Sequence, residues 1–223
     1  YHMVRRCEEL LYDCPVDGLN IIDVGAGNGF LSHYLVECAG ANSVEAVDNY
    51  EGKGSPSYAI SIIKKMQEVL GNSEHVKIIK SDFMKYTPKN KSNCVIFLNV
   101  LHHIINHIKK ELGVETSKAV ETVLKHAAEC LQEGGKLIFQ EFMNHNYYLL
   151  PFYRNFVNSV DYKSKIPFEI WEPTLKKIGF INVKVRYRLP LFFSTRSDLR
   201  YLFNNRIASL LTDSSFVMLA IRA

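Results

Sequence analysis

Three glycines at alternate positions, Gly25, Gly27 and Gly29, closely follow Asp23 at the end of an apolar run. We call residues 25–29 the glycine corner. Glycine adopts turn conformations that other residues avoid, and it lets a ligand approach the main chain without a Cβ in the way. The pattern is typical of a loop that binds a nucleotide-like ligand between a strand and a helix. A glycine-rich turn that binds nothing is the alternative.

The spacing of these glycines disagrees with two common phosphate-binding loops. A dinucleotide-binding loop reads G-x-G-x-x-G/A and needs a small residue where this chain has Phe30. A P-loop needs Gly-Lys-Ser/Thr after the glycines, and residues 28–30 supply none of it. The charge of Asp23 disfavours a pyrophosphate and favours a ligand with an ammonium group. S-adenosylmethionine, an amino acid joined through a sulfonium sulfur to a nucleoside, has that form.

The glycine corner resembles the first motif of the class I S-adenosylmethionine-dependent methyltransferases, small-molecule type. In that motif a hydrophobic residue and an acid precede Gly-x-Gly-x-Gly, and Asp23 and the three glycines match it, with Ala26 between them. The resemblance extends over residues 19–222. It implies S-adenosylmethionine as the cofactor. It also implies an α/β three-layer sandwich with a seven-stranded, mostly parallel sheet, an antiparallel last strand and helices on both faces.

Two further acids fall where contacts to the nucleoside are expected. Asp48 ends an apolar segment 23 residues beyond Gly25, about where a βαβ unit brings a carboxylate to a ribose diol. By resemblance, Asp82 binds the adenine amino group and its neighbours flank the ring. A surface acid at position 48 and a helix cap at position 81 or 82 are the alternatives. The other cofactor-binding candidates adjoin these acids or follow the apolar run that ends at residue 98: Asn49, Ser81, Phe83, Asn99 and Val100.

The apolar run that ends at residue 98 leads into His102 and His103, which resembles the fourth motif of small-molecule methyltransferases. The Asp/Asn-Pro-Pro-Tyr/Phe sequence of enzymes that methylate exocyclic base nitrogens is missing. By resemblance the two histidines lie near the transferred methyl, so one of them can take a proton from the substrate. Packing and hydrogen bonds at a helix start are the alternative. His107 lies four residues after His103, but no third zinc ligand is evident, and we predict no metal.

Glu141 and His145 complete the catalytic candidates. They lie at or beyond the end of an apolar segment over residues 136–142. Open α/β sheets bind ligands beyond the carboxyl ends of their strands, so both residues face the region where a substrate would bind. Solvated loop residues without a catalytic role are the alternative.

The pattern of apolar residues predicts the elements that must position these side chains. Strands are expected at 21–24, 43–48, 75–80, 94–98, 136–142, 181–189 and 216–221. Helices are expected after His103 and at 4–13, 28–38, 56–70, 116–131, 172–178 and 197–211. By resemblance, the last strand inserts between the fifth and the sixth. We expect a single domain over residues 3–223.

Eight aromatic residues lie within residues 143–171. By resemblance, insertions at this point cover the substrate site, so we predict a small, aromatic or hydrophobic substrate enclosed away from water. Packing of the same residues on the sheet is the alternative. Three basic residues, Arg154, Lys163 and Lys165, are interleaved with the aromatic ones and leave a lipid-like or single-stranded nucleic-acid substrate open.

The composition is that of an ordinary globular domain, with 47% apolar residues among 223 and a formal charge of +4. The charges are scattered without a basic arm, so a nucleic-acid partner is not expected. The five cysteines contain no CxxC pair, which favours reduced thiols. No segment reaches the roughly 18 apolar residues that span a bilayer, and no signal peptide is visible. We expect a cytoplasmic protein, and the sequence says nothing of its oligomeric state.

These observations predict direct, in-line transfer of a methyl group from S-adenosylmethionine to an O, N, S or C atom of a small, partly apolar molecule. Two alternatives stay open. One is a methyltransferase that acts on protein or RNA, and the other is a module that binds the cofactor without catalysis.

Overall fold

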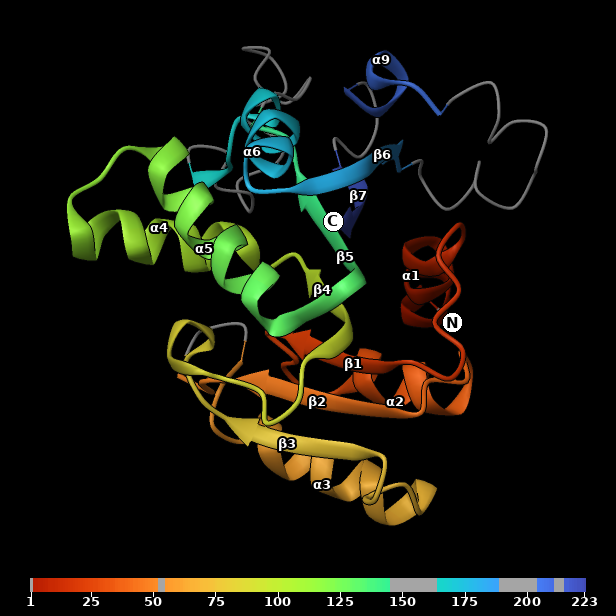
Figure 1. Cartoon of the computed structure of the whole chain (residues 1–223). Helices are drawn as coiled ribbons and strands as arrows, with labels where there is room; N and C mark the ends of the chain where they lie inside the picture. The colour runs from red at the N-terminus through yellow and green to blue at the C-terminus, as the bar shows by residue number, and fades with distance from the viewer. Residues whose placement is uncertain (1, 52–54, 145–163, 189–203, 211–214) are drawn as a thin grey trace, which may run out of the picture. The chain divides into compact units, whose positions relative to one another are not determined.

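The computed structural model describes residues 2–51, 55–144, 164–188, 204–210 and 215–223 (Figure 1). The chain forms two compact units. The first unit comprises Tyr1–Leu98, Lys125–Ile138 and Ile221–Ala223, and the second comprises Asn99–Leu124 and Phe139–Ala220. The glycine corner therefore belongs to the first unit, whereas His102, His103 and Glu141 belong to the second.

A seven-stranded sheet has the strand order β3-β2-β1-β4-β5-β7-β6. It is mostly parallel with one antiparallel strand and has helices around it, which confirms the fold class expected from the sequence. The last strand lies between the fifth and the sixth, as the resemblance implied. The strands are β1 (Asn20–Val24), β2 (Ser43–Asp48), β3 (Val76–Lys80), β4 (Ser92–Leu98), β5 (Leu131–Phe142), β6 (Phe180–Tyr187) and β7 (Ser215–Arg222).

In the first unit, β1 is the strand around which the others are arranged (Figure 1). It pairs in parallel with β2 on one side and with β4 on the other. The register aligns Val24 with Val47 and with Phe97, so the carboxyl ends of these three strands meet at one edge of the sheet. The residues that directly follow or end these strands, Gly25 and Asp48 among them, therefore lie at the same edge. This is the edge where open α/β sheets bind ligands.

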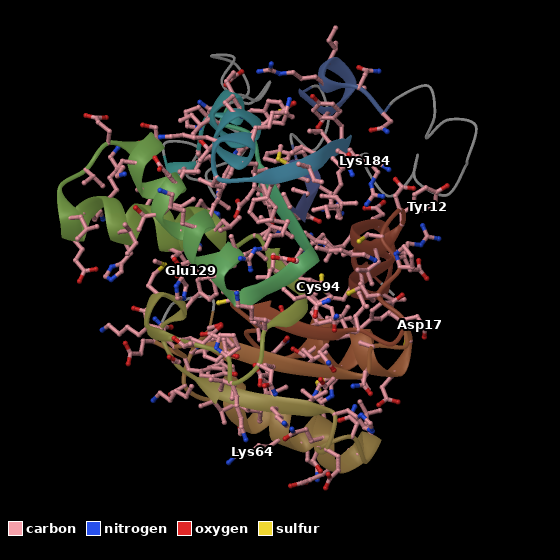
Figure 2. The ribbon with its side chains drawn as sticks, in the orientation of Figure 1. Tyr12, Asp17, Lys64, Cys94, Glu129 and Lys184 are labelled. Carbon is pink, nitrogen blue, oxygen red and sulfur yellow. The ribbon has the colours of Figure 1, made fainter. Side chains whose placement is uncertain are left out.

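The helices of the first unit are α1 (His2–Leu11), α2 (Phe30–Glu37), α3 (Ala59–Leu70) and the short η1 (Phe83–Lys85). α2 and α3 pack against each other and against the strands. α3 begins later than the predicted residue 56, because the carbonyl of Pro56 closes a separate turn with the N–H of Ala59. Figure 2 shows Lys64 of α3 extending outward, whereas Cys94 of β4 lies among other side chains and is fully buried.

The core of the second unit is aromatic. The helices of the second unit are α4 (Leu101–Leu112), η4 (Phe168–Ile170), α6 (Trp171–Lys177) and α9 (Arg206–Leu210). Helix α5 (Thr116–Cys130) begins in the second unit and ends in the first. Trp171 is fully buried with its ring centroid 4.9 Å from that of Phe139, and Phe168 lies 5.0 Å from Phe216. Trp171 is thus a core residue, and the half-buried Phe168 packs at its edge against Phe216. The other six aromatic residues of the predicted cover lie outside the described residues.

Two element boundaries differ from the sequence prediction. β5 begins at Leu131, directly after α5, whereas the sequence predicts a strand only over 136–142. Gly134 lies inside the strand with a φ of 71° and so marks a bend in it. Of the helix predicted over 197–211, only residues 204–210 are described, and Arg206–Leu210 of these form α9.

All five cysteines are free, as expected, and only Cys38 is exposed. Across the described ranges, no helix is long and apolar enough to cross a membrane.

Candidate active site

The glycine corner connects β1 to α2 and is closely packed against β2 and α3. The N–H of Gly25 donates to the carbonyl of Val47 over 2.8 Å, which holds the start of the corner against β2. Gly29, at the N-terminus of α2, has a φ of 77°. A Cβ at this position would lie 2.6 Å from Cγ1 of Ile63 in α3. Both backbone conformation and space therefore require glycine at position 29.

Asp23 lies beneath the corner and is only 1% exposed. Ser32 of α2 donates its hydroxyl to Oδ2 of Asp23 over 2.6 Å. Burial raises the pKa of Asp23 to about 6, the hydrogen bond from Ser32 opposes this shift, and the charge of Asp48 adds to it. Asp23 thus ties β1 to α2. Its role toward the ammonium group of a cofactor stays a prediction.

Asp48, at the end of β2, organises the loops around it. Its Oδ2 accepts the N–H of Gly27 over 3.0 Å and the hydroxyl of Ser55 over 2.6 Å, and its Oδ1 accepts the N–H of Tyr50 over 2.7 Å. The next residue, Asn49, is exposed. Because Asp48 is 7% exposed and accepts three hydrogen bonds, the alternative of a plain surface acid is wrong.

Ser81 and Asp82 follow β3, and Asp82 caps the short helix η1. The N–H of Ser81 donates to the carbonyl of Asp48 over 3.0 Å, which joins the ends of β3 and β2. Oδ1 of Asp82 accepts the N–H of Met84 over 2.9 Å, so the capping role considered from the sequence is confirmed. A contact between Asp82 and adenine stays a prediction.

Phe83 packs inward. Its ring is 4% exposed and lies edge-to-face on Phe97, with centroids 5.2 Å apart, and on His126, with centroids 4.8 Å apart. These contacts belong to the core of the first unit. A place for this ring beside adenine stays a prediction.

In the second unit, Asn99 and Val100 connect the end of β4 to α4. Asn99 has a φ of 57°, a left-handed conformation that is uncommon outside glycine. Its N–H donates to the carbonyl of Gln140 over 2.9 Å, and its Oδ1 accepts the amide of Gln140 over 3.3 Å. Such conformations cluster at functional sites, where surrounding contacts hold them in place.

Glu141 and Lys165 both contact His102. Oε2 of Glu141 lies 2.8 Å from Nδ1 of His102, and Nζ of Lys165 lies 2.7 Å from Nε2 of the same ring. Oε1 of Glu141 also accepts the main-chain N–H of His102 over 3.3 Å. His102 is 4% exposed and Glu141 1% exposed, so the alternative of a solvated Glu141 is wrong. We call these three residues and His103 the histidine cluster.

His103 lies on the outer side of the histidine cluster, with its ring centroid 4.1 Å from that of His102. Partial burial lowers the pKa of His103, the neighbouring His102 and the charge of Lys165 add to this shift, and the charge of Glu141 opposes it. The fourth catalytic candidate, His145, lies outside the described residues. In the described part of the chain, no three His, Cys, Asp or Glu side chains are grouped so that they could hold a metal ion.

A comparison with protein families identifies the chain. Residues 2–182 match a family described as a methyltransferase domain. The chain belongs to this methyltransferase family. The match includes the glycine corner and all four residues of the histidine cluster. Among curated protein sequences, none matches this methyltransferase significantly.

Solved structures share the fold of this methyltransferase over almost its whole length. Magnesium protoporphyrin IX methyltransferase from Synechocystis PCC 6803, with bound SAH, has a TM-score of 0.60 and 19% identity and is aligned over 100% of this chain and 82% of its own. Phosphoethanolamine N-methyltransferase 2 of Haemonchus contortus has a TM-score of 0.66 and 15% identity, with 100% and 52% covered. The S-adenosylmethionine-dependent methyltransferase SibL has a TM-score of 0.61 and 18% identity, with 99% and 55% covered. This methyltransferase thus spans about half the length of two of these relatives, and at such identities the likeness shows the fold.

Three residues that contact the predicted site residues could not be recognised from the sequence. Ser32 and Ser55 supply the hydroxyl donors to Asp23 and Asp48. Lys165 was noted only as one basic residue in an aromatic segment. Its contact with His102 joins positions 63 residues apart, and no local pattern indicates such a contact.

Proposed function

We propose that this methyltransferase transfers a methyl group from S-adenosylmethionine, in line, to an O, N, S or C nucleophile of a small, partly apolar molecule. The observation that carries the proposal is the glycine corner, in which Gly29 can bear no side chain and Asp48 binds the main chain of Gly27. When bound, S-adenosylmethionine supplies a methyl group on a positively charged sulfur that leaves as a neutral sulfide. The family match supports methyl transfer as the reaction.

The residues of the first unit fit this cofactor. Asp23 and Asp48 are close enough for the charge of Asp48 to raise the pKa of Asp23, so the corner favours a cation such as the ammonium group. The hydroxyl of Ser55 is a rotatable donor to Asp48, which a ribose hydroxyl can replace. Asp82 uses Oδ1 for the N–H of Met84, and an adenine amino group would donate to Oδ2.

The protein's main contributions in this proposal are alignment and exclusion of water. Near-attack geometry can lower a barrier by about 7 to 11 kcal/mol. A general base increases the rate by a further factor of about 10² to 10⁴ when the acceptor group carries a proton. The proposed candidates for that base are the histidines of the cluster, supported by Glu141, and His145.

A small aromatic or hydrophobic substrate is the proposed class. Its support is the aromatic residues of segment 143–171 other than Trp171, which lies in the core. We propose this segment as the substrate cover of a single domain over 3–223. The relatives named for protoporphyrin and phosphoethanolamine methylation also act on small molecules. The five free thiols favour a reducing compartment, and we propose the cytoplasm.

Titration calorimetry with S-adenosylmethionine tests the corner. Gly29→Ala should weaken binding by about tenfold or more, equivalent to about 1.4 kcal/mol, because the new Cβ displaces Ile63 beneath the corner. Gly71→Ala is the matched control, since Gly71 also has a positive φ, of 68°, and no atom lies within 4 Å of its Cβ position. Equal losses of affinity in both variants would remove the corner as the binding site.

Turnover is tested by incubating the protein with methyl-labelled S-adenosylmethionine and a metabolite extract. Label in a small molecule is the expected result. Label that enters only protein or RNA fractions, or cofactor binding with no labelled product in several extracts, would contradict the proposal.

A further inference from the structure

Both ring nitrogens of His102 are engaged by charged side chains. Glu141 lies 2.8 Å from Nδ1, and Lys165 lies 2.7 Å from Nε2. Both partners follow His102 in the sequence, Glu141 on β5 and Lys165 in the segment before η4. His102 therefore has no ring nitrogen left for a substrate while these contacts hold.

The chemistry of the two partners fixes where the protons lie. An ionised carboxylate only accepts hydrogen bonds, so Nδ1 of His102 carries the proton that is shared with Glu141. An ammonium group only donates, so Nε2 carries the lone pair that accepts from Lys165. His102 is then a neutral imidazole with a defined tautomer. The negative charge of Glu141 and the positive charge of Lys165 cancel across it, which suits a buried position.

The segment that carries Lys165 is held in place by contacts beside the histidine cluster. Nδ2 of Asn106, one turn after His102 on α4, donates to the carbonyl of Ser164 over 2.7 Å. Nζ of Lys165 lies 5.5 Å from the centre of the Phe142 ring, within the range of a cation–π contact. Ile166, the next residue, is 3% exposed. Lys165 is thus anchored on both sides as well as at its ammonium group.

We propose that Lys165 is a positioning residue that, with Glu141, holds His102 as a neutral imidazole with both nitrogens occupied and so leaves His103 as the proton acceptor of the cluster. The catalytic part of this inference rests on the proposed methyl transfer. The proton arrangement of His102 does not, and it can be measured without a substrate.

His103 has the properties that a proton acceptor needs. It is exposed, whereas His102 is buried. The charged and titratable groups that face it are His102, Lys165 and Glu141, and with partial burial their net effect lowers the pKa of His103, so its ring is neutral with a lone pair at physiological pH. In the transfer step, the acceptor's lone pair forms the new bond to the methyl carbon, and the carbon–sulfur electron pair goes to sulfur. The proton of the acceptor group passes to the free nitrogen of His103.

Nitrogen-15 NMR of the histidine rings, without cofactor or substrate, tests the arrangement. His102→Gln identifies the signals of His102 by their loss. At pH 7, wild-type His102 should show the neutral form with the proton on Nδ1. His126 is an internal reference for a ring nitrogen that donates at Nε2, because its Nε2 faces the carbonyls of Phe83 and Tyr86 at 2.8 and 3.0 Å.

Lys165→Met is the decisive variant. Without the ammonium group, Nε2 of His102 loses the donor that lies 2.7 Å from it in the wild type, so the Nε2 signal should shift. Lys109→Met is the matched control. Lys109 lies on α4, the helix that also carries His102, and it donates to Thr116 over 2.9 Å. Its replacement should leave the His102 signals unchanged. A doubly protonated or Nε2-protonated His102 in the wild type, or no change in Lys165→Met, would overturn the inference.

The catalytic part is tested on the small molecule that takes up label from the extract. His103→Gln should slow transfer by about 100-fold or more and abolish the rise of rate with pH. Lys165→Met should slow it less and move that rise along the pH axis, since Lys165 acts through its neighbours. A larger loss of rate in His102→Gln than in His103→Gln would reverse the assignment. Cofactor affinity, measured in the same variants, should not change, and this separates failure of the cluster from failure of the cofactor site.

Discussion

Two buried carboxylates show how differently the two units treat charge. Asp23 in the first unit and Glu141 in the second are each 1% exposed. Asp23 receives a hydrogen bond from the neutral hydroxyl of Ser32, and among the described residues the like charge of Asp48 raises its pKa further. Glu141 contacts His102, whose other nitrogen contacts the ammonium group of Lys165.

This difference in charge balance indicates what kind of group each site can bind. Among the described residues of the first unit, none supplies a positive charge that acts on Asp23, so its negative charge is costly in the isolated protein and favourable once a cation binds. The histidine cluster balances its charges internally, which suits a device that must keep one geometry through a reaction. Replacing each carboxylate with its amide should therefore have opposite effects on stability.

Glu141→Gln should give the largest effect. It removes the charge of a carboxylate that is 1% exposed and contacts His102, and removing one member of a buried charged pair costs about 3 to 5 kcal/mol in the free energy of unfolding. Urea denaturation at pH 7 measures the change. Glu68→Gln is the control, because the Lys65–Glu68 pair has a similar separation of 3.0 Å but lies in solvent, and its loss should be undetectable. Similar changes in the two variants would show that the balance of charge around Glu141 contributes little.

Asp23→Asn should stabilise the protein, but only at a pH at which Asp23 of the wild type is ionised. The folded state raises the pKa of Asp23 from 3.8 to about 6, so the folded protein holds this proton more tightly than the unfolded chain. The contribution of Asp23 to the free energy of unfolding is therefore greatest below pH 3.8. This contribution is lost as the pH rises through about 6, by about 3 kcal/mol at most. Asparagine removes that loss and can still accept from Ser32. At pH 8 the variant should be more stable than the wild type while binding S-adenosylmethionine more weakly.

Urea denaturation between pH 4 and pH 8 follows this difference, which should grow up to pH 6 and then stay constant. Asp17→Asn serves as the control, since Asp17 is an exposed residue of the same unit, as Figure 2 shows, and should give no difference that depends on pH. An Asp23→Asn variant that is less stable than the wild type at pH 8 would contradict the account of Asp23 as an unbalanced charge.

The sequence predicts the first unit far better than the second. The corner is a local pattern, because Asp23 and the glycines that define it lie within seven consecutive positions and each has a conformational or electrostatic reason to be there. The ends of β1 and β2 then follow from the parallel register, which brings Asp48 to Gly27. The sequence also marks Asp82 correctly as a possible cap.

The histidine cluster could be predicted only in part. His102 and Glu141 were named separately, from the ends of two apolar runs, but the pairing between them spans 39 positions and that with Lys165 spans 63. Burial decides which of the two adjacent histidines is enclosed, and a single sequence does not report burial. Trp171, expected in a cover, is a core residue for the same reason: aromatic side chains suit both places.

Asn99 gives the smallest and sharpest comparison. The first unit turns its chain after β1 with Gly25, at a φ of 72°, and the chain turns after β4 with Asn99, at 57°. If the left-handed backbone is the whole reason, Asn99→Gly should leave the free energy of unfolding unchanged, whereas Asn99→Ala should lower it by about 1 kcal/mol, because alanine has a Cβ and no local hydrogen bond to offset the strain. If the two variants lose stability equally, the side-chain contact between Asn99 and Gln140, at 3.3 Å, is what matters. Urea denaturation of both variants separates these outcomes, and in the second case the turn after β4 depends on its side chain in a way that the glycine corner does not.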